Sequence, residues 1–119
     1  MDLQIRRMEK EDIESCTELF IQAFAREPWK ENHEALAVCI GMSKPWMKGI
    51  EYYLDLLCVD WRWQGKGIGS LFLEKVQQEL EKDGIHGVLL STERTYPAYE
   101  FYKKNGFQEI EGIVLMGKE

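Results

Sequence analysis

The chain has 119 residues, of which 45% are hydrophobic, 12% aromatic and 30% charged. This composition indicates one globular domain over residues 1–119, with enough apolar side chains for a core and no long disordered segment. The 21 acidic residues outnumber the 15 basic ones, and the net charge is −6. Such a chain repels nucleic-acid phosphates and attracts small cations such as amines, so we expect no nucleic-acid partner.

The three cysteines, Cys16, Cys39 and Cys58, lie far apart within apolar stretches. They form no CxxC pair and have no histidine at metal-ligand spacing, so we expect buried thiols and no metal site. The N-terminal residues do not read as a signal peptide, and no apolar run reaches the roughly 18 residues that cross a bilayer. We therefore expect a cytoplasmic protein without a membrane partner.

Hydrophobic periodicity predicts the elements of the N-terminal half. In chain order these are a strand over 3–8, a helix from its N-cap Asp12 to Pro28, a strand over 35–40, a turn over 41–49 and a strand over 50–59. The last strand is dense in apolar and aromatic residues, which predicts a central strand that is buried on both faces.

The C-terminal half continues with alternating helices and strands. The expected elements are a helix over 67–83, a strand over 88–90, a helix from Pro97 to Asn105 and a closing hairpin of 107–110 with 113–116. The order strand, glycine-rich turn, helix, strand is a βαβ unit, which requires two parallel strands and a right-handed crossover. The whole chain is therefore expected to form a mixed α/β domain.

The connection over residues 64–70, between the central strand and the helix that follows, reads Gln-Gly-Lys-Gly-Ile-Gly-Ser. Amide groups in the first turn of a helix have no intrahelical acceptor, and the helix dipole favours an anion at the same end. Glycines let the backbone turn tightly and approach that anion closely. The connection therefore predicts a phosphate-binding loop.

Three kinds of phosphate loop compete for this segment, and spacing separates them. A Walker loop does not fit, because Gly67 rather than Ser or Thr follows Lys66, and Asp60 stands at the first glycine position. A dinucleotide fingerprint does not fit either, because Ser70 or Phe72 would occupy its last glycine position. The pattern that remains is Q-x-x-G-x-G.

This pattern, at Gln64, Gly67 and Gly69, resembles the pyrophosphate loop of the GNAT acetyltransferases. A second family element, A-x-x-F-Y-x-x-x-G-F, stands downstream at Ala98, Phe101, Tyr102, Gly106 and Phe107. Together the two elements extend the resemblance over about residues 51–116. It implies the GNAT fold, an α+β mixed sheet, and transfer of an acetyl group from acetyl-CoA to a primary amine within a ternary complex. The acceptor is a small molecule, or a peptide or protein amine.

The resemblance also implies which residues bind coenzyme A. The central strand of the family splays away from its parallel neighbour and offers backbone groups to the pantetheine arm, and the matching positions are Leu57, Cys58 and Val59. The loop positions that match the pyrophosphate site are Gln64, Gly65, Lys66, Gly67, Ile68, Gly69 and Ser70. Thr95 stands where relatives often have an asparagine that reaches the coenzyme arm.

Tyr102 matches the family's tyrosine that protonates the leaving thiolate. A phenol with a pKa of about 10 can donate to a thiolate whose acid has a pKa of about 8.5, given close contact. Many relatives carry a glutamate base at the position of Leu56. Asp55 adjoins that position and is our candidate base, although successive strand side chains point to opposite faces. Glu51, Tyr52 and a water chain remain alternatives.

Relatives place a second helix and a further strand before the strand that ends near Gly41, yet only a few residues separate Trp29 from Ala35. The chain is therefore identified as a shortened GNAT member whose acceptor side lacks one wall. We expect a homodimer to cover the uncovered sheet edge, or else residues 29–46 to fold back over it.

The shortened acceptor side leaves three functions open. The first is an active N-acetyltransferase, the second a non-catalytic acyl-CoA-binding or interaction module, and the third an unrelated phosphate-binding domain. Four aromatic residues are candidates to line the remaining cleft, where a cation would stack on a ring, or else to pack within the core and hairpin. They are Trp29, Trp46, Tyr52 and Tyr53.

Overall fold

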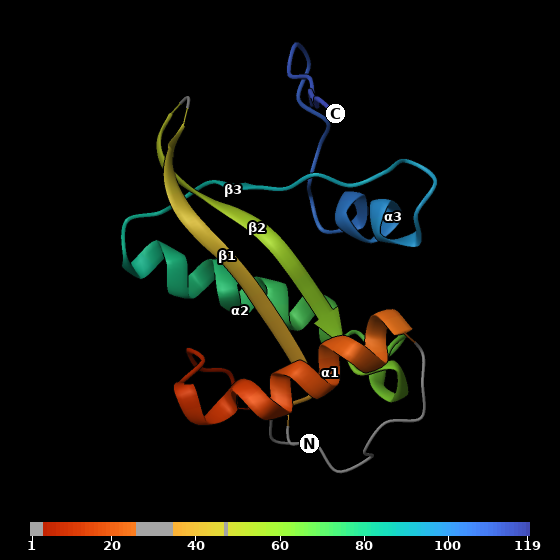
Figure 1. Ribbon diagram of the computed structural model, residues 1–119. Coiled ribbons are helices and arrows are strands. Elements are labelled where there is room, and N and C mark those ends of the chain that lie inside the picture. The colour runs from red at the N-terminus through yellow and green to blue at the C-terminus, as the bar shows by residue number, and fades with distance from the viewer. Residues whose placement is uncertain (1–3, 26–34, 47) are drawn as a thin grey trace.

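The computed structural model describes residues 4–25, 35–46 and 48–119 (Figure 1), with the backbone alone for residues 20–25. Its helices and strands are α1 (Ile13–Ala25), β1 (Ala37–Trp46), β2 (Gly49–Val59), α2 (Ile68–Lys82), β3 (Val88–Leu89) and α3 (Pro97–Lys104). The expected helix stop at Pro28 lies outside the described residues.

The three strands form one mixed sheet in the order β1-β2-β3. β1 and β2 are antiparallel along their full length, from Ala37 opposite Val59 to Trp46 opposite Gly49. β2 and β3 are parallel, and they pair only where Tyr52 and Tyr53 meet β3. The parallel pair and the crossover helix α2 confirm the predicted βαβ unit and the mixed α/β class.

A β-bulge interrupts the ladder between β1 and β2. Ile40 lies opposite Leu56 while the next residue, Gly41, lies opposite Leu54, so Asp55 has no partner on β1. A bulge adds one residue to one strand and therefore shifts the alternation of side chains between the two faces. The part of β2 before Asp55 and the part after it thus follow opposite alternation.

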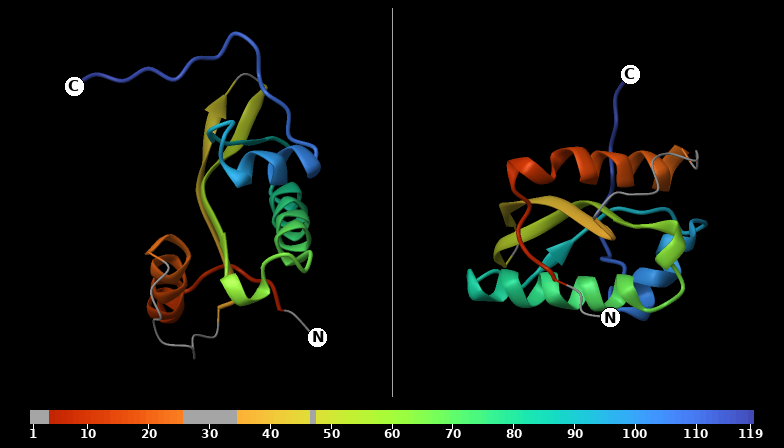
Figure 2. Two further views of the ribbon diagram at one scale, coloured as in Figure 1. Left: turned by 90° about the vertical axis from the view of Figure 1, so that its right-hand side faces the viewer. Right: turned by 90° about the horizontal axis from the view of Figure 1, so that it is seen from below.

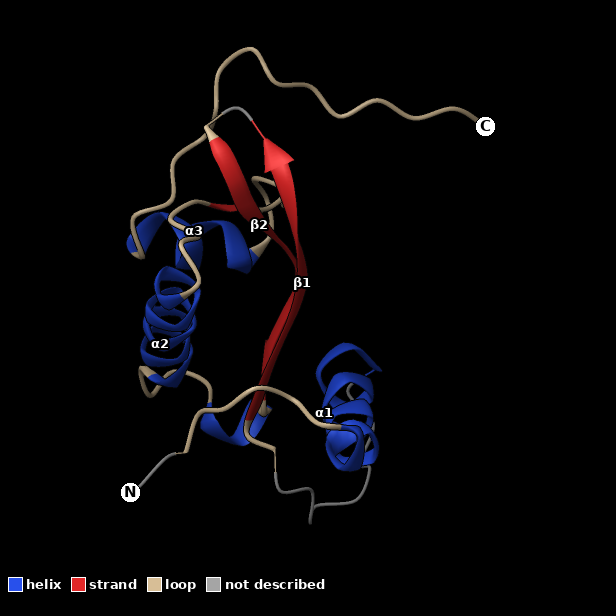
Figure 3. Cartoon of the chain, turned by 90° about the vertical axis from the view of Figure 1, so that its left-hand side faces the viewer, coloured by secondary structure: helices blue, strands red, loops and turns tan. Residues whose placement is uncertain are grey.

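The core consists of two clusters, one on each face of the sheet. α1 covers one face, and α2 and α3 lie on the other (Figures 2 and 3). The first cluster contains Leu19, Val38 and Cys58, and the second contains Leu54, Leu73 and Tyr102. Burial of β2 on both faces confirms its predicted central position.

The change in side-chain alternation at the bulge is reflected in the residues of these clusters. Leu54 and Leu57 lie three residues apart, which in a regular strand would place them on opposite faces. Both pack against the cluster under α2 and α3. Cys58 points the other way and packs with Leu19 and Val38.

The expected first strand over residues 3–8 is wrong for its described part. Residues 4–9 form no strand and lead into a 3₁₀ turn, η1 (Lys10–Asp12). Ile5 and Met8 are three positions apart, so a strand would turn them to opposite faces rather than to one core. Asp12 is not the N-cap of α1; its carboxylate instead accepts the Glu9 N–H at 2.8 Å and the Arg6 guanidinium at 2.6 and 2.7 Å.

β1 is longer than predicted, because residues 41–46 continue the strand instead of forming a turn. Pro45 is accommodated because β1 is the edge strand of the described sheet, where a missing N–H need not break a ladder bond. Gly41 is required by a close approach. A Cβ at Gly41 would lie 2.6 Å from the Tyr52 ring and 2.3 Å from the Tyr53 carbonyl oxygen.

The predicted closing hairpin of residues 107–116 does not form. A turn is present at Glu111 and Gly112, but residues 107–119 hold no strand. β3 is only two residues long and offers little edge for further pairing. The segment therefore runs away from the body of the protein (Figure 2), with Leu115 89% and Met116 85% exposed.

Candidate functional site

The connection from β2 to α2 begins with a buried carboxylate. Asp60 is fully buried and caps a 3₁₀ turn, η2 (Trp61–Trp63). Its carboxylate accepts the Arg62 N–H at 2.9 Å and the Arg62 guanidinium at 2.8 Å, and its own N–H donates to the Leu36 carbonyl at 2.7 Å. The bonds to Arg62 hold the turn together, and the bond to Leu36 ties the start of the loop to the residue before β1. We expected no such role for Asp60, although Asp is favoured immediately before a helix.

The next residues give the loop its shape. The Gln64 side-chain amide donates to the Val59 carbonyl at 3.0 Å and so ties the loop back to the end of β2. Gly65 and Gly67 have φ of 76° and 79°, in the left-handed region that glycine adopts without strain. A Cβ on either residue would meet no atom within 4 Å, so both backbones face open space.

Gly67 is the N-cap of α2 and supplies no side-chain cap. The first intrahelical bond runs from the Leu71 N–H to the Gly67 carbonyl at 3.1 Å. The N–H groups of Ile68, Gly69 and Ser70 lie in the first turn, where no intrahelical acceptor exists. These amides and the positive end of the helix dipole make this end of α2 suitable for an anion.

Gly69 and Lys66 differ in role from the two left-handed glycines. A Cβ at Gly69 would lie 3.0 Å from Phe101 Cε1 and 3.7 Å from Val59 Cγ2, so Gly69 lets α2 approach both α3 and β2. The exposed Lys66 places its Nζ 5.0 Å from the centroid of the Trp63 ring. This contact holds a positive charge beside the loop.

The strands separate next to the loop. Within the described residues, β2 continues for six residues beyond Tyr53, its last position paired with β3. Leu57, Cys58 and Val59 are paired with β1 on one side. Their other side is free of strand pairing in the described chain, so this end of β2 combines open backbone with the anion-binding turn.

Tyr102 lies beside this opening, under the same cluster that includes Leu57. Its side chain is 9% exposed, and its ring meets Phe101 and Phe107 edge to face at centroid distances of 5.3 Å. Burial raises the pKa of the Tyr102 phenol, and the nearby Cys39 adds to the shift. The hydroxyl therefore keeps its proton at neutral pH and can act as a proton donor.

Asp55 and Thr95 lie further from the packed core. Asp55 is exposed on the bulge. The pKa of Tyr52 is raised mainly by burial, then by the charge of Cys39 and the hydrogen bond with it, and least by the charge of Asp55. Thr95 is exposed in the segment after β3, where its hydroxyl donates to the Glu93 carboxylate at 3.2 Å. The structure thus brings Leu57–Val59, residues 64–70 and Tyr102 together, while Thr95 and Asp55 remain at the surface.

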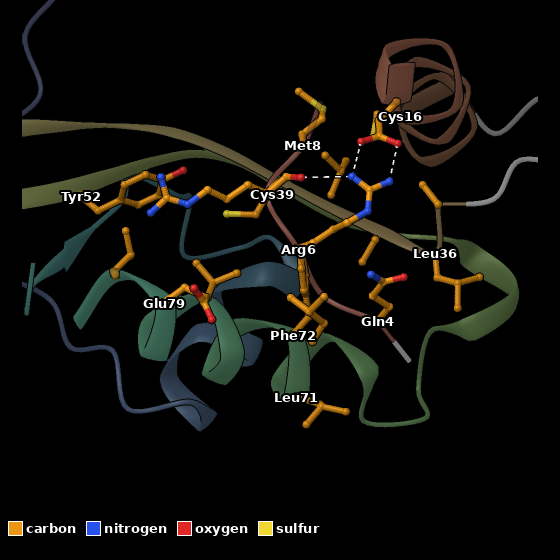
Figure 4. A pocket seen from close by; sticks show the side chains of 18 of the residues that line it. Gln4, Arg6, Met8, Cys16, Leu36, Cys39, Tyr52, Leu71, Phe72 and Glu79 are labelled. Atoms are coloured by element: carbon orange, nitrogen blue, oxygen red, sulfur yellow. Dashed lines mark hydrogen bonds and ion pairs between the residues drawn. The ribbon is translucent and has the colours of Figure 1, made fainter. Parts of the chain in front are cut away.

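A cavity of about 660 Å³ lies on the β1 side of the sheet (Figure 4). Residues 4–8, η1 with the start of α1, β1 and α2 line it, and Ile68 is its only lining residue from residues 64–70. Arg6 pairs with Asp12 inside it.

Two further properties concern the described residues alone. No helix among them is both long and apolar enough for a bilayer crossing. Within the same ranges, no group of three or more His, Cys, Asp or Glu side chains is placed to hold a metal ion. The three thiols are free, with Cys58 buried and the other two half-buried.

Solved structures with the same fold include several acetyltransferases. The aminoglycoside 6'-N-acetyltransferase AAC(6')-IG from Acinetobacter haemolyticus matches with a TM-score of 0.75 and 12% identity, over 98% of this chain and 99% of that one. An aminoglycoside acetyltransferase from an uncultured soil metagenomic sample, in complex with sisomicin, matches at 0.73 and 14%, over 92% and 88%. An aminoglycoside N-acetyltransferase in complex with CoA matches at 0.73 and 14%, over 93% and 91%.

A search of curated proteins finds no match. The family model for the acetyltransferase (GNAT) domain matches residues 28–109, which include the central strand, the glycine loop, α2 and α3. This stretch covers more than half of the chain. The protein therefore belongs to the GNAT acetyltransferase family.

Proposed function

We propose that this protein is an N-acetyltransferase that moves an acetyl group from acetyl-CoA to a primary amine. The observation that carries the proposal is the open end of β2 beside the turn of Gly65 and Gly67, within a chain of this family. A relative with the same fold was solved in complex with CoA, which supports the cosubstrate.

The proposed cofactor site uses backbone groups above all. The first-turn amides of α2, from Ile68 to Ser70, and the turn at Gly65 and Gly67 hold the pyrophosphate, with the Lys66 charge nearby. The free backbone side of Leu57–Val59 pairs with the pantetheine arm, and Thr95 lies at the end of the arm. Gln64 acts indirectly, since its bond to the Val59 carbonyl fixes the loop to the strand.

The proposed reaction is direct transfer in one complex. The amine nitrogen forms a bond to the acetyl carbon, the carbon–sulfur bond breaks, and the amine loses a proton while the thiolate gains one. Tyr102 supplies the proton to the sulfur from its phenol, which is protonated at neutral pH and lies beside the open end of β2. Asp55 accepts the amine proton, directly or through water, from its exposed position on the bulge.

The proposed acceptor is a small cationic amine. Three relatives by fold are aminoglycoside acetyltransferases, and the net charge of −6 draws cations toward the protein. Three free thiols support a reducing, cytoplasmic location.

We also propose a homodimer of this single domain. The exposed apolar residues of the C-terminal segment, Val114, Leu115 and Met116, and the free edge of β1 are features that a partner copy would cover. Sedimentation equilibrium at micromolar concentration tests it, and a single species of monomer mass at every concentration would exclude the dimer.

Coenzyme A binding is tested by thermal unfolding. At a concentration about 100-fold above the dissociation constant, coenzyme A should stabilise the protein by roughly 2.7 kcal/mol. Gly67→Val should abolish this shift, because it places a side chain where the pyrophosphate binds. Gly84→Val is the matched control, since Gly84 has a φ of 76° with no atom near its Cβ position but lies at the other end of α2.

Three outcomes separate the candidate functions. An unchanged melting temperature in saturating coenzyme A would contradict both coenzyme-binding functions. A normal shift in Gly67→Val would contradict the assignment of the loop. If coenzyme A binds but a thiol-release assay with acetyl-CoA and a panel of amines shows no transfer, the chain is a binding module instead.

A further inference from the structure

No helix of the described residues covers the hairpin end of the sheet face that carries α1. α1 packs where β1 begins and β2 ends, through the cluster of Val38 and Cys58. The tip of the hairpin extends well beyond α1 (Figures 1 and 3). There Met42 is 59% exposed and Trp46 is 39% exposed.

An ammonium group already occupies this face. The Lys44 Nζ lies 4.3 Å from the centroid of the Tyr53 ring and 4.9 Å from that of Trp46. The Tyr53 hydroxyl is fixed by a 2.7 Å hydrogen bond to Ser91 Oγ, so its ring is held in place across β2 and the segment after β3. Two aromatic faces that hold one ammonium group form a site for organic cations.

Glu51 lies two residues before Tyr53 on β2, on the same face of the sheet. Glu51 is the cross-strand partner of Lys44, and its Oε2 is buried without a hydrogen-bond partner. Its other oxygen packs against Gly87, where an added Cβ would lie 2.9 Å away. A buried carboxylate oxygen without a donor is unfavourable, and a bound cation would satisfy it. Lys44 points to the rings and makes no ion pair with Glu51.

We propose that Glu51, Trp46 and Tyr53 form a subsite for the second ammonium group of a di- or polyamine acceptor, which displaces Lys44. We call these three residues with Lys44 the ammonium box. The proposal rests on the proposed function, because the first amine is the one that is acetylated. In the free protein Lys44 stacks on the rings. The ligand ammonium group replaces it there and also forms an ion pair with Glu51 Oε2, which Lys44 leaves without a partner.

The geometry of β2 sets the spacing of the two amines. Tyr53 and Leu57 are four positions apart, and a strand rises about 3.3 Å per residue, so roughly 13 Å separate the box from the open end of β2. The bulge at Asp55 shortens this distance somewhat. A flexible chain or a set of linked rings with amines about that far apart spans both points, whereas a monoamine or a very short diamine does not.

Calorimetric titration with 1,8-diaminooctane, without coenzyme A, tests the box separately from catalysis. Lys44→Met should bind the diamine roughly 3-fold tighter, because the internal competitor is gone. Lys48→Met removes the same charge from the neighbouring turn and should leave affinity nearly unchanged. Glu51→Gln, which is isosteric, should weaken binding several-fold. Equal affinities in the Lys44 and Lys48 variants, or an unaffected Glu51→Gln variant, would overturn the proposal.

Acetylation assays provide the second readout. The ratio of kcat/KM per amine group for 1,8-diaminooctane to that for 1-aminooctane should exceed 1 in the wild type and fall toward 1 in both Glu51→Gln and Trp46→Leu. 1,3-Diaminopropane should show no such advantage over 1-aminopropane. A ratio that the variants leave unchanged would refute the subsite. If no amine is acetylated while the titrations behave as expected, the proposed function fails and the ammonium box stands.

Discussion

The two faces of the sheet differ in how far helices cover them. On the face of α2 and α3, one cluster runs from Leu54 through Leu73 to Tyr102 and reaches the glycine loop. On the other face, the cluster of Leu19, Val38 and Cys58 covers one end only. Beyond that end, aromatic and charged side chains of the hairpin face solvent.

This difference separates two requirements of the proposed enzyme. A pyrophosphate must meet backbone amides in a fixed arrangement, which requires a loop held by packed neighbours. An acceptor amine can be attracted by exposed rings and carboxylates that few neighbours constrain. The covered face therefore suits the cosubstrate, and the uncovered face leaves room for change in the acceptor.

The largest effect on the rate is expected at Tyr102, the proposed proton donor on the face covered by α2 and α3. Tyr102→Phe should lower the rate of acetyl transfer about 10²- to 10⁴-fold, because the proton donor to the thiolate is lost. The affinity for coenzyme A should stay nearly constant, since the ring packing is kept. Steady-state kinetics and a coenzyme A titration measure both. An unchanged rate, with chemistry shown to be rate-limiting, would leave Tyr102 a packing residue only.

The next largest difference is expected in the stability lost by mutations on the two faces of the sheet. Leu73→Ala, at a side chain that is 1% exposed, should lower the free energy of unfolding by about 2–5 kcal/mol. Met42→Ala, on the uncovered face, should change it by no more than about 0.5 kcal/mol. Leu71→Ala is the control on the same helix, because Leu71 is 40% exposed. Urea unfolding measures all three, and similar losses at Leu73 and Met42 would contradict the comparison.

High pH should weaken both clusters. Burial raises the pKa of Cys58 under α1 to about 11, and it raises that of Tyr102 under α2 and α3. A raised pKa in the folded state gives stability that is complete below the unfolded pKa and is lost as pH rises through the folded value. The urea midpoint should therefore fall between about pH 9 and 11. Cys58→Val should reduce that fall, and an unchanged midpoint to pH 11 would count against it.

The elements with strong local signals could be predicted from the sequence. The helical period and glycine punctuation identified α2, and Pro97 and Asn105 bracketed α3. The Q-x-x-G-x-G spacing located the turn that the structure forms at Gly65 and Gly67. Each of these signals depends on residues close in sequence, so distant contacts do not alter it.

The features that depend on distant pairing could not be predicted in this way. Residues 113–116 are apolar enough for a strand, but a strand needs an edge to pair with, and β3 is too short to offer one. β1 continues through Pro45 because no strand of the described residues pairs with its outer edge, which only the strand order reveals. The cation contacts of Lys44 depend on the register of the hairpin, which the sequence pattern did not specify.

The bulge at Asp55 is a one-residue insertion in β2 relative to β1, so the alternation of side chains along β2 changes phase there. Before it, even-numbered residues such as Tyr52 and Leu54 contact the α2 side; after it, the odd-numbered Leu57 does so. Removing Asp55 would leave a regular ladder in which every other residue of β2 keeps its partner on β1 and therefore its face, so Cys58 would stay with Val38.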